Sequence, residues 1–130
     1  MLASPRYKHL FSPGSIGTMR LKNRIVMAPM VTQFTPESGE VSPVLRDYLA
    51  QRAKGGVGLI ETEATCVDPA GKGWVNGLGL DRDGLVRSHV ELTEAVHRCG
   101  AKIAVQLHHG GNRADLRATG GRLVGASPVG

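Results

Sequence analysis

Two short apolar segments, far apart in the chain, end on residues that can bind a flat ligand with polar edges. One is residues 24–30, Arg-Ile-Val-Met-Ala-Pro-Met, and the other is residues 105–111, Val-Gln-Leu-His-His-Gly-Gly. The amide of Gln106 offers an acceptor beside a donor, the pattern that pairs with the edge of a heterocycle. The alternative is an amide that bonds to the neighbouring backbone, as buried amides often do. The two segment ends are therefore the first candidate site.

Three residues near the second segment are ordinary metal ligands, namely His108, His109 and Asp115. Adjacent residues of a strand point to opposite faces, so both histidines reach one metal only if the strand has already ended. The cysteines, Cys66 and Cys99, stand far apart and lack the paired spacing of a zinc site or a redox dithiol. A site without a metal is favoured, and a metal-dependent hydrolase is the lesser alternative.

The elements that must position these residues are short strands alternating with helices. Continuous apolar character predicts buried strands at residues 25–30, 57–63 and 102–107. Ahead of them, residues 14–24 alternate weakly and contain Gly and Asn for turns, which predicts a small hairpin. Long loops leave the strands, whereas the connections into them are short. Function in α/β proteins gathers at the carboxyl ends of strands, so these ends are the candidate active face.

Two helices are predicted between the strands. We expect Ser42 to cap the first, with Pro43 in its first helical position. We expect Asp83 to cap the second, which ends at Gly100. The predicted apolar faces are Val44, Leu45, Tyr48, Leu49 and Ala53 for the first helix and Leu85, Val86, His89, Leu92, Thr93 and Val96 for the second. The order of elements indicates parallel strands joined by right-handed crossovers.

Charge and hydropathy argue against two classes of partner. The formal net charge is +5, and five dispersed basic residues precede the first acid, Glu37. Because few aromatic residues accompany them, a solvated surface is favoured over a nucleic-acid site. The longest apolar run, residues 25–31, is too short to span a bilayer, and the amino-terminal residues lack the apolar stretch of a signal peptide. These features predict a cytoplasmic protein without a nucleic-acid or membrane partner.

The chain resembles the old yellow enzyme family of FMN-dependent ene-reductases, with its NADH:flavin oxidoreductase and 2,4-dienoyl-CoA reductase branches. The matching residues are, in order, Leu21–Met30, Gly58–Ile60, Glu63–Thr65 and Val105–Leu107, then His109 and Gly111. A complete eight-stranded barrel needs roughly 250 residues, whereas this chain has 130. The resemblance implies an α/β fold, the N-terminal portion of a TIM (β/α)8 barrel. It would be one partial FMN-binding domain over residues 1–130, with three parallel βα units preceded by the short hairpin.

The resemblance also implies an FMN site. Its cofactor-binding residues would be Ala28, Pro29, Met30, Val31, Ala64 and Gln106. The first three would line one face and edge of the isoalloxazine ring, the small Ala64 would let the ring lie close, and Gln106 would bind the pyrimidine edge. Val31 stands where the family often has Cys or Thr. Asn112 stands where an Arg usually follows the glycine, although Arg113 comes next.

The implied function is an FMN-dependent oxidoreductase that reduces activated C=C bonds of enones, enoates or enoyl thioesters. NAD(P)H would reduce the flavin, which would then give a hydride to the β-carbon of a small unsaturated carbonyl substrate. Three parallel strands leave two unpaired edges, so we expect a homo-oligomer or the remainder of the barrel as partner, and little activity from 130 residues alone. The alternative function is a non-catalytic truncated barrel that acts as an assembly or regulatory module.

Overall fold

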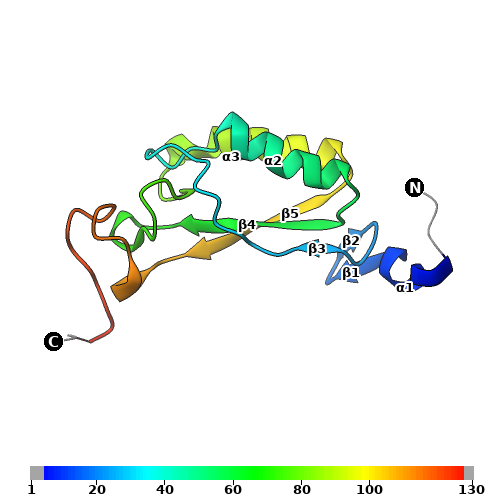
Figure 1. Ribbon diagram of the computed structural model, residues 1–130, viewed down its shortest axis with the longest axis horizontal. Coiled ribbons are helices and arrows are strands. Elements are labelled where there is room, and N and C mark those ends of the chain that lie inside the picture. The colour runs from blue at the N-terminus through cyan, green and yellow to red at the C-terminus, as the bar shows by residue number, and fades with distance from the viewer. Residues whose placement is uncertain (1–4, 128–130) are drawn as a thin grey trace.

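The chain folds around a three-stranded parallel sheet with the strand order β3-β4-β5. The structure, a computed structural model, describes residues 5–127. The strands are β3 (Val26–Met27), β4 (Leu59–Cys66) and β5 (Lys102–His108). Two helices, α2 (Pro43–Lys54) and α3 (Val86–Arg98), connect them. Figure 1 shows both helices over one face of the sheet, while no described helix covers the opposite face.

A small hairpin and several single-turn helices surround the sheet. β1 (Gly14–Ile16) and β2 (Met19–Leu21) pair antiparallel, within the stretch where the sequence predicts a hairpin. The turn between them holds Gly17 at a φ of +55°, a left-handed conformation that glycine adopts without steric cost. The single-turn elements are η1 (Pro5–Tyr7), α1 (Lys8–Phe11), η2 (Pro69–Gly71), η3 (Asp83–Leu85) and η4 (Gly111–Arg113). Among residues 5–127, no helix is long and apolar enough to cross a bilayer.

Helix α2 begins where the sequence predicts it. The Ser42 hydroxyl accepts a hydrogen bond from the amide nitrogen of Leu45, at 3.0 Å, and Pro43 takes the first helical position. The buried side chains of the helix are Leu45, Leu49 and Ala53. Val44, which the apolar pattern also placed on this face, is 59% exposed. Neighbouring helical residues stand about 100° apart, so Val44 points away from the face that Leu45 buries.

Helix α3 begins later than the sequence predicts. Asp83 opens the single turn η3 and makes no capping hydrogen bond with its side chain, and the α-helix starts at Val86. The turn closes through the backbone, because the amide of Leu85 donates to the carbonyl of Arg82 at 3.1 Å. The buried side chains of α3 are His89, Leu92, Ala95 and Val96. Gly100, at a φ of +73°, follows the end of the helix as predicted.

The core lies between the two helices and the sheet. Its buried side chains are Leu45, Leu49, Ala53, Ile60, Leu78, Leu92, Val96 and Ala101. Each helix therefore contributes an apolar stripe, and the central strand contributes Ile60. This packing holds the crossover helices in place and leaves the carboxyl ends of the strands to the loops.

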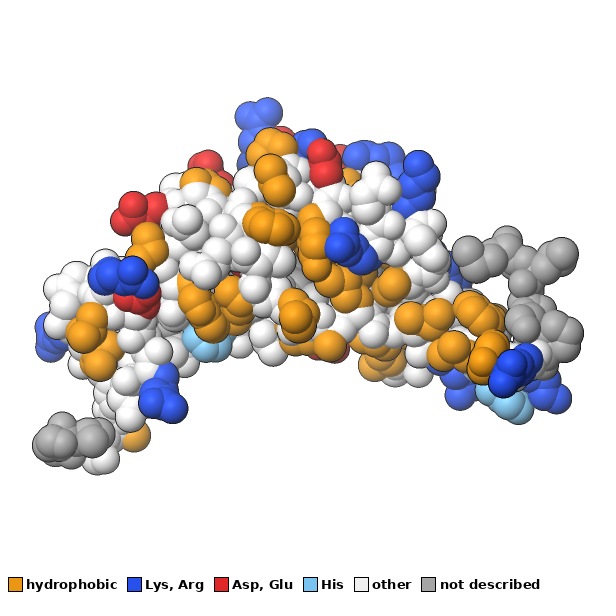
Figure 2. Space-filling model, viewed as in Figure 1, with side chains coloured by type: hydrophobic (Ala, Val, Ile, Leu, Met, Phe, Trp, Pro, Cys, Tyr) orange, Lys and Arg blue, Asp and Glu red, His pale blue; other side chains and the backbone are white. Residues whose placement is uncertain are grey.

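Two of the three strands are less buried than the sequence predicts. The expected buried strand at 25–30 pairs only through Val26 and Met27, and Val26 is 45% exposed. On β5, Val105 and Leu107 are also exposed, and Figure 2 shows hydrophobic side chains on the surface over the sheet and the hairpin. The physical reason is that the described helices cover one face only, and β3 and β5 each have a single neighbour. Continuous apolar character indicates two covered faces, which this chain does not supply alone.

The central strand is longer than predicted and carries one extra residue opposite β5. Ala64, expected to begin a loop, lies inside β4, which continues to Cys66. Glu61 lies opposite Ala104, and Ala64 lies opposite Gln106, so three steps on β4 match two on β5. Such a bulge breaks the alternation of side chains and places Glu61 and Ala64 on the same face of the sheet. If the same sequence paired in a regular register without the bulge, Glu63 would lie opposite Gln106.

The described residues contain two strand-helix units and a third strand, rather than the three complete βα units predicted. After β5 the chain continues through η4 and a series of turns up to residue 127. The third strand is therefore not followed by a described α-helix that would cover its outer part. This difference also explains why the face and outer edge of β5 are exposed.

Two polar side chains close the amino end of the sheet. The ammonium group of Lys22 donates to the carbonyl oxygens of Cys99, at 3.2 Å, and Ala53, at 3.5 Å, where α3 and α2 end. The amide of Asn23 donates to the carbonyl of Gly56 at 2.7 Å. A cation at the carboxyl end of a helix is favourable because the carbonyl groups there carry partial negative charge.

Candidate functional site

The predicted site residues gather at the carboxyl edge of the parallel sheet. Residues 28–31 continue directly from β3, Ala64 lies near the end of β4, and Gln106 lies near the end of β5. Because the three strands run in the same direction, these positions share one edge. The sequence-based placement of the six residues at one edge therefore agrees with the strand pairing.

Ala64 and Gln106 form the centre of this candidate site. They are register partners on neighbouring strands, so their side chains lie on the same face of the sheet. Ala64 is 7% exposed and ends in a methyl group, whereas the Gln106 side chain is exposed. Among residues 5–127, none of the hydrogen bonds involves the Gln106 side-chain amide. The alternative in which this amide bonds to the neighbouring backbone is therefore not what the structure contains.

Threonine hydroxyls replace the hydrogen bonds that the bulge removes from the ladder. The backbone amide of Gln106 donates to the hydroxyl of Thr62 at 3.3 Å. The hydroxyls of Thr62 and Thr65 lie 3.1 Å apart and both donate to the carbonyl of Glu63, at 3.1 and 2.8 Å. Both threonines are buried. Sequence reasoning assigned no separate role to either threonine, although buried hydroxyls are in most cases hydrogen-bonded.

The segment after β3 is held by a buried carboxylate that sequence reasoning missed. The backbone amide of Thr32 donates to Glu63 Oε2 at 2.9 Å, and the Thr32 hydroxyl donates to the same oxygen at 2.5 Å. Glu63 is only 3% exposed, whereas Met30, two residues before Thr32, is 65% exposed. A glutamate within an apolar strand was the signal in the sequence, because charged residues are rarely buried without a partner.

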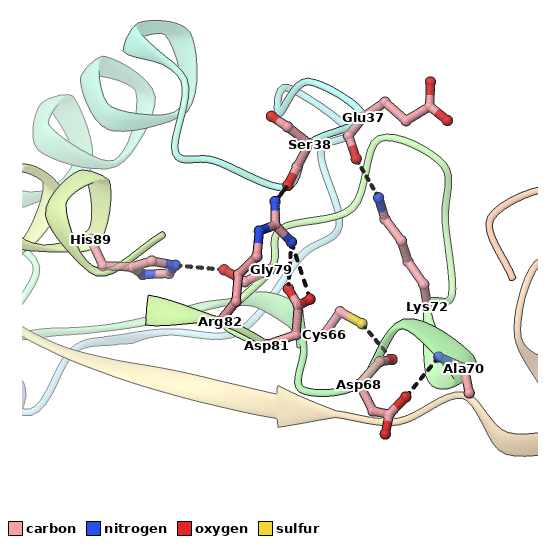
Figure 3. A network of polar contacts seen from close by, with 10 residues as sticks. All are labelled: Glu37, Ser38, Cys66, Asp68, Ala70, Lys72, Gly79, Asp81, Arg82 and His89. Atoms are coloured by element: carbon pink, nitrogen blue, oxygen red, sulfur yellow. Dashed lines mark hydrogen bonds and ion pairs between the residues drawn. The ribbon is translucent and has the colours of Figure 1, made fainter. Parts of the chain in front are cut away.

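The loops that follow β3 and β4 are joined by backbone and side-chain contacts (Figure 3). The Lys72 ammonium group donates to the carbonyl of Glu37 at 2.5 Å, and Arg82 donates to the carbonyl of Ser38 at 2.5 Å. His89 Nε2 lies 2.8 Å from the carbonyl oxygen of Gly79, which fixes the second loop to α3. The elaborated loops are therefore ordered against each other above the sheet.

A cleft of about 230 Å³ lies between these loops, and Cys66, Lys72 and Arg82 are among its lining residues. Lys72, Asp81 and Arg82 are engaged by hydrogen bonds. The Cys66 thiol donates to the carbonyl of Asp68 at 3.0 Å. Burial raises the pKa of this thiol above its ordinary value. Ligand sites usually measure about 300–1,000 Å³, so this cleft is too small for a flavin.

The three residues proposed as metal ligands have different neighbours. The His108 ring packs against Trp74, with ring centroids 5.5 Å apart. His109 Nδ1 accepts a hydrogen bond from the amide of Gly111 at 3.1 Å. Asp115 pairs with Arg117 at 2.7 Å, and this contact lowers the pKa of Asp115 to about 2. Within the described residues no cluster of three ligating side chains occurs, so the metal hypothesis finds no support in the geometry.

The residues at the carboxyl edge fit the isoalloxazine ring of FMN. The ring is flat, and the methyl group of Ala64 is the smallest side chain that a strand can place beneath it apart from glycine. The free amide of Gln106 can donate to and accept from the pyrimidine edge. Glu63 Oε1 is buried without a hydrogen-bond partner among the described residues, so an unsatisfied acceptor lies beside the position of Ala64 in the chain.

Known proteins of one family match this chain over nearly its whole length. The model of the NADH:flavin oxidoreductase / NADH oxidase family matches residues 9–129. An NADH oxidase of Thermoanaerobacter brockii is 47% identical over 125 residues, covering 95% of this chain and 19% of that protein. The chain therefore spans only a fraction of the length of such relatives.

Solved structures agree with this match. The old yellow enzyme homologue from Zymomonas mobilis superposes with a TM-score of 0.80 at 35% identity, covering 85% of this chain and 31% of that one. Morphinone reductase in complex with tetrahydroNAD gives 0.75 at 36% identity, covering 81% and 28%. The likeness identifies the sheet as part of a barrel of the old yellow enzyme type. FMN is the flavin of this family, and NAD(P)H is its reductant. The chain belongs to the NADH:flavin oxidoreductase / NADH oxidase family.

Proposed function

We propose that this chain binds FMN at the carboxyl edge of its sheet, as the flavin-binding part of an oxidoreductase that reduces activated C=C bonds with NAD(P)H. The observation that carries the proposal is that the small Ala64 lies opposite Gln106, whose side-chain amide has no described hydrogen bond. A ring lying on Ala64 has its pyrimidine edge within reach of that amide. Family membership supports the choice of flavin.

Each proposed contact has a physical role. Gln106 binds and orients the pyrimidine edge, and Ala64 leaves room for the ring. Ala28, Pro29, Met30 and Val31 line a face and an edge of the ring through backbone and side-chain contacts, and the exposed side chain of Met30 is free to do so. FMN, when bound, supplies hydride transfer, and the protein supplies binding and orientation. Val31 has no hydrogen-bond donor in its side chain, so flavin tuning by a side chain at this position is absent.

The substrate class we propose is a small unsaturated carbonyl compound: an enone, an enoate or an enoyl thioester. Polarised double bonds of this kind accept a hydride at the β-carbon. Both cysteines are free, which agrees with a cytoplasmic location. The residues that would grip the carbonyl group and donate the proton are not assigned to any position of this chain. We therefore expect little turnover from the 130 residues by themselves.

The exposed side of the sheet favours association. Exposed apolar side chains lie on both outer strands, including Val26, Val105 and Leu107, and each outer strand has one unpaired edge. Unpaired edges and apolar patches promote pairing with further chain. We propose a homo-oligomer or the remainder of a barrel as the partner. The same observation is the basis of the alternative function, a non-catalytic assembly or regulatory module.

Titration of the purified chain with FMN tests the proposal. Binding should quench the flavin fluorescence, and NAD(P)H followed by an enone should bleach and then restore the flavin absorption when the chain is supplied within a complete barrel. Gln106→Leu should weaken FMN binding, while Ser127→Ala, near the end of the described chain, should not. Absence of FMN binding by the wild-type chain, alone and within a barrel, favours the assembly module. A stoichiometric metal in elemental analysis would instead favour the hydrolase.

A further inference from the structure

Glu63 is a buried carboxylate with only one of its two oxygens engaged. Oε2 accepts hydrogen bonds from the backbone amide and the hydroxyl of Thr32. Oε1 is buried and has no hydrogen-bond partner among residues 5–127. The whole residue is 3% exposed. An acceptor left unsatisfied away from water is costly, so a carboxylate in this position needs a reason beyond packing.

The place of Glu63 in the chain gives that reason. It directly precedes Ala64, on which the flavin ring would lie. Its partner Thr32 directly follows Val31, the last residue of the segment expected to line the ring. The side-chain contact therefore joins the end of β3 to β4 beside the candidate site, 31 positions apart in the sequence. Residues 28–31 themselves have no described hydrogen bond to a side chain of β4, so the contact of Thr32 is the one that fixes the end of this segment.

The charge of this group acts over a distance as well. Both donors of Thr32 point at one oxygen, and a charged oxygen accepts such hydrogen bonds more strongly than a neutral one. The second oxygen is not compensated by any described donor, and none of the salt bridges among residues 5–127 involves Glu63. Where the effective dielectric constant is low, such a charge interacts electrostatically with neighbouring groups that it does not contact directly. A flavin gains negative charge when it is reduced, so a fixed negative charge nearby opposes its reduction.

We propose that Glu63 is a positioning and electrostatic residue of the flavin site. It holds the segment Met30–Thr32 against Ala64, and its charge lowers the midpoint potential of the bound flavin. The inference rests on the proposed FMN site. Strand β4 would then contribute two neighbouring residues to the site: Ala64, on which the ring lies, and Glu63, which positions the adjacent segment.

Glu63→Gln tests both parts, because glutamine keeps the size and an accepting oxygen but removes the charge. Glu61→Gln is the matched control, since Glu61 is a partly exposed carboxylate on the same strand without a described hydrogen bond. We expect Glu63→Gln to raise the flavin midpoint potential and to weaken FMN binding about tenfold, the loss expected for one charge-assisted hydrogen bond. Glu61→Gln should leave both close to wild type, because solvent screens its charge.

Thr32 provides a second pair of variants with less risk to folding. Thr32→Val removes the hydroxyl donor and should weaken FMN binding, whereas Thr32→Ser retains the donor and should bind like wild type. Thermal unfolding of each variant without FMN shows whether it is folded. A folded Glu63→Gln protein that binds FMN with the wild-type potential would overturn the electrostatic part. Equal affinity of the Val and Ser variants would overturn the positioning part.

A readout without flavin separates this inference from the proposed function. Hydrogen exchange of the Thr32 amide should be slow in the wild type and in Glu61→Gln and faster in Glu63→Leu, which has no accepting oxygen. If the wild type does not bind FMN, the proposed function fails, and with it the electrostatic part, while the exchange rate still reports the hold on Thr32. Unchanged exchange in Glu63→Leu would overturn that hold whether or not FMN binds.

Discussion

The methyl group of Ala64 lies directly opposite Gln106 across two parallel strands, on the face of the sheet that no described helix covers. A larger side chain at position 64 would occupy the surface on which a flat ring has to lie. We expect Ala64→Leu to weaken FMN binding by tenfold or more, measured by quenching of flavin fluorescence. Ala104→Leu is the control, because Ala104 is exposed on the same face but nearer the amino end of β5. Equal affinities of the two variants would contradict this placement of the ring.

Gly58, at the start of β4, has no room for a side chain. A Cβ atom there would stand 2.6 Å from Asn23 Oδ1 and 2.8 Å from the Asn23 carbonyl oxygen. Gly58→Ala should therefore destabilise the protein by about 1–3 kcal/mol, the usual cost of overpacking. Gly84→Ala is the matched control, since a Cβ at Gly84 meets nothing within 4 Å. Urea unfolding compares the two variants, and similar midpoints would show that the approach to Asn23 is not restrictive.

Ser42 joins the start of α2 to the preceding loop. Its hydroxyl accepts from the amide of Leu45 and donates to the carbonyl of Phe34. Ser42→Ala should lower the free energy of unfolding by about 1 kcal/mol, as for other capping residues. Thr93→Ala changes a partly buried hydroxyl that bonds only within its own helix, to Val90, and should cost less. Thermal unfolding of both variants gives the comparison, and a greater loss for Thr93→Ala would argue against the cap.

Lys22 stabilises both crossover helices through its contacts with the carbonyls of Ala53 and Cys99. Lys22→Met keeps the apolar stem but removes the charge, so we expect a loss of about 0.5–1 kcal/mol in unfolding free energy at low salt. High salt should reduce the difference, because ions screen a partly exposed charge. Lys102→Met, at an exposed position in β5 rather than at the end of a helix, serves as the control. A loss independent of salt would point to packing rather than charge.

Cys66 should react slowly with thiol reagents. Burial raises its pKa, so less of it is thiolate at any given pH, and the thiolate is the reactive form. Iodoacetamide labelling followed by peptide mapping should modify the partly exposed Cys99 before Cys66. Faster labelling of Cys66 in the folded protein would contradict the buried, neutral thiol.

The same shift links stability to pH. The folded state keeps the Cys66 proton to a higher pH than the unfolded chain, whose thiol ionises near pH 8.5. The stabilising contribution is therefore complete below about pH 8.5 and declines as the pH rises from there toward the folded pKa. Cys66→Ala should unfold with a flatter dependence on pH in that alkaline range than the wild type. Parallel curves would show that the thiol does not contribute.

Local sequence signals predicted the elements whose determinants are local. Ser42 and Pro43 specify the start of α2 through contacts within one helical turn, and Gly100 ends the turn after α3 in the same way. The predicted start of α3 was wrong because Asp83 begins a separate single turn that is closed by backbone hydrogen bonds. The residue types that cap an α-helix also begin such turns, so the sequence pattern does not separate the two. The prediction that β3 and β5 are buried was wrong. Burial depends on which elements cover each face of a strand, and an apolar run does not specify those elements.

The candidate site was predictable in part. The order of strands places residues 28–31, Ala64 and Gln106 at one edge, and the strand pairing agrees. The contact of Glu63 with Thr32 was not predicted, because it depends on which way each side chain of β4 points. The bulge reverses the alternation of side-chain directions along β4 at one residue, and the sequence contains no periodic pattern that predicts where a bulge occurs.

The extra residue in β4 makes this region sensitive to length more than to identity. Deleting Thr62 would remove the bulge and leave Ala64 opposite Gln106, but Glu63 would then lie opposite Val105, and the hydroxyl that accepts from the backbone amide of Gln106 would be lost. Natural variants of this strand should therefore accept exchanges of similar side chains but not the loss or gain of a codon. The number of residues between Glu61 and Ala64 is therefore constrained by the structure as strongly as the side chains themselves.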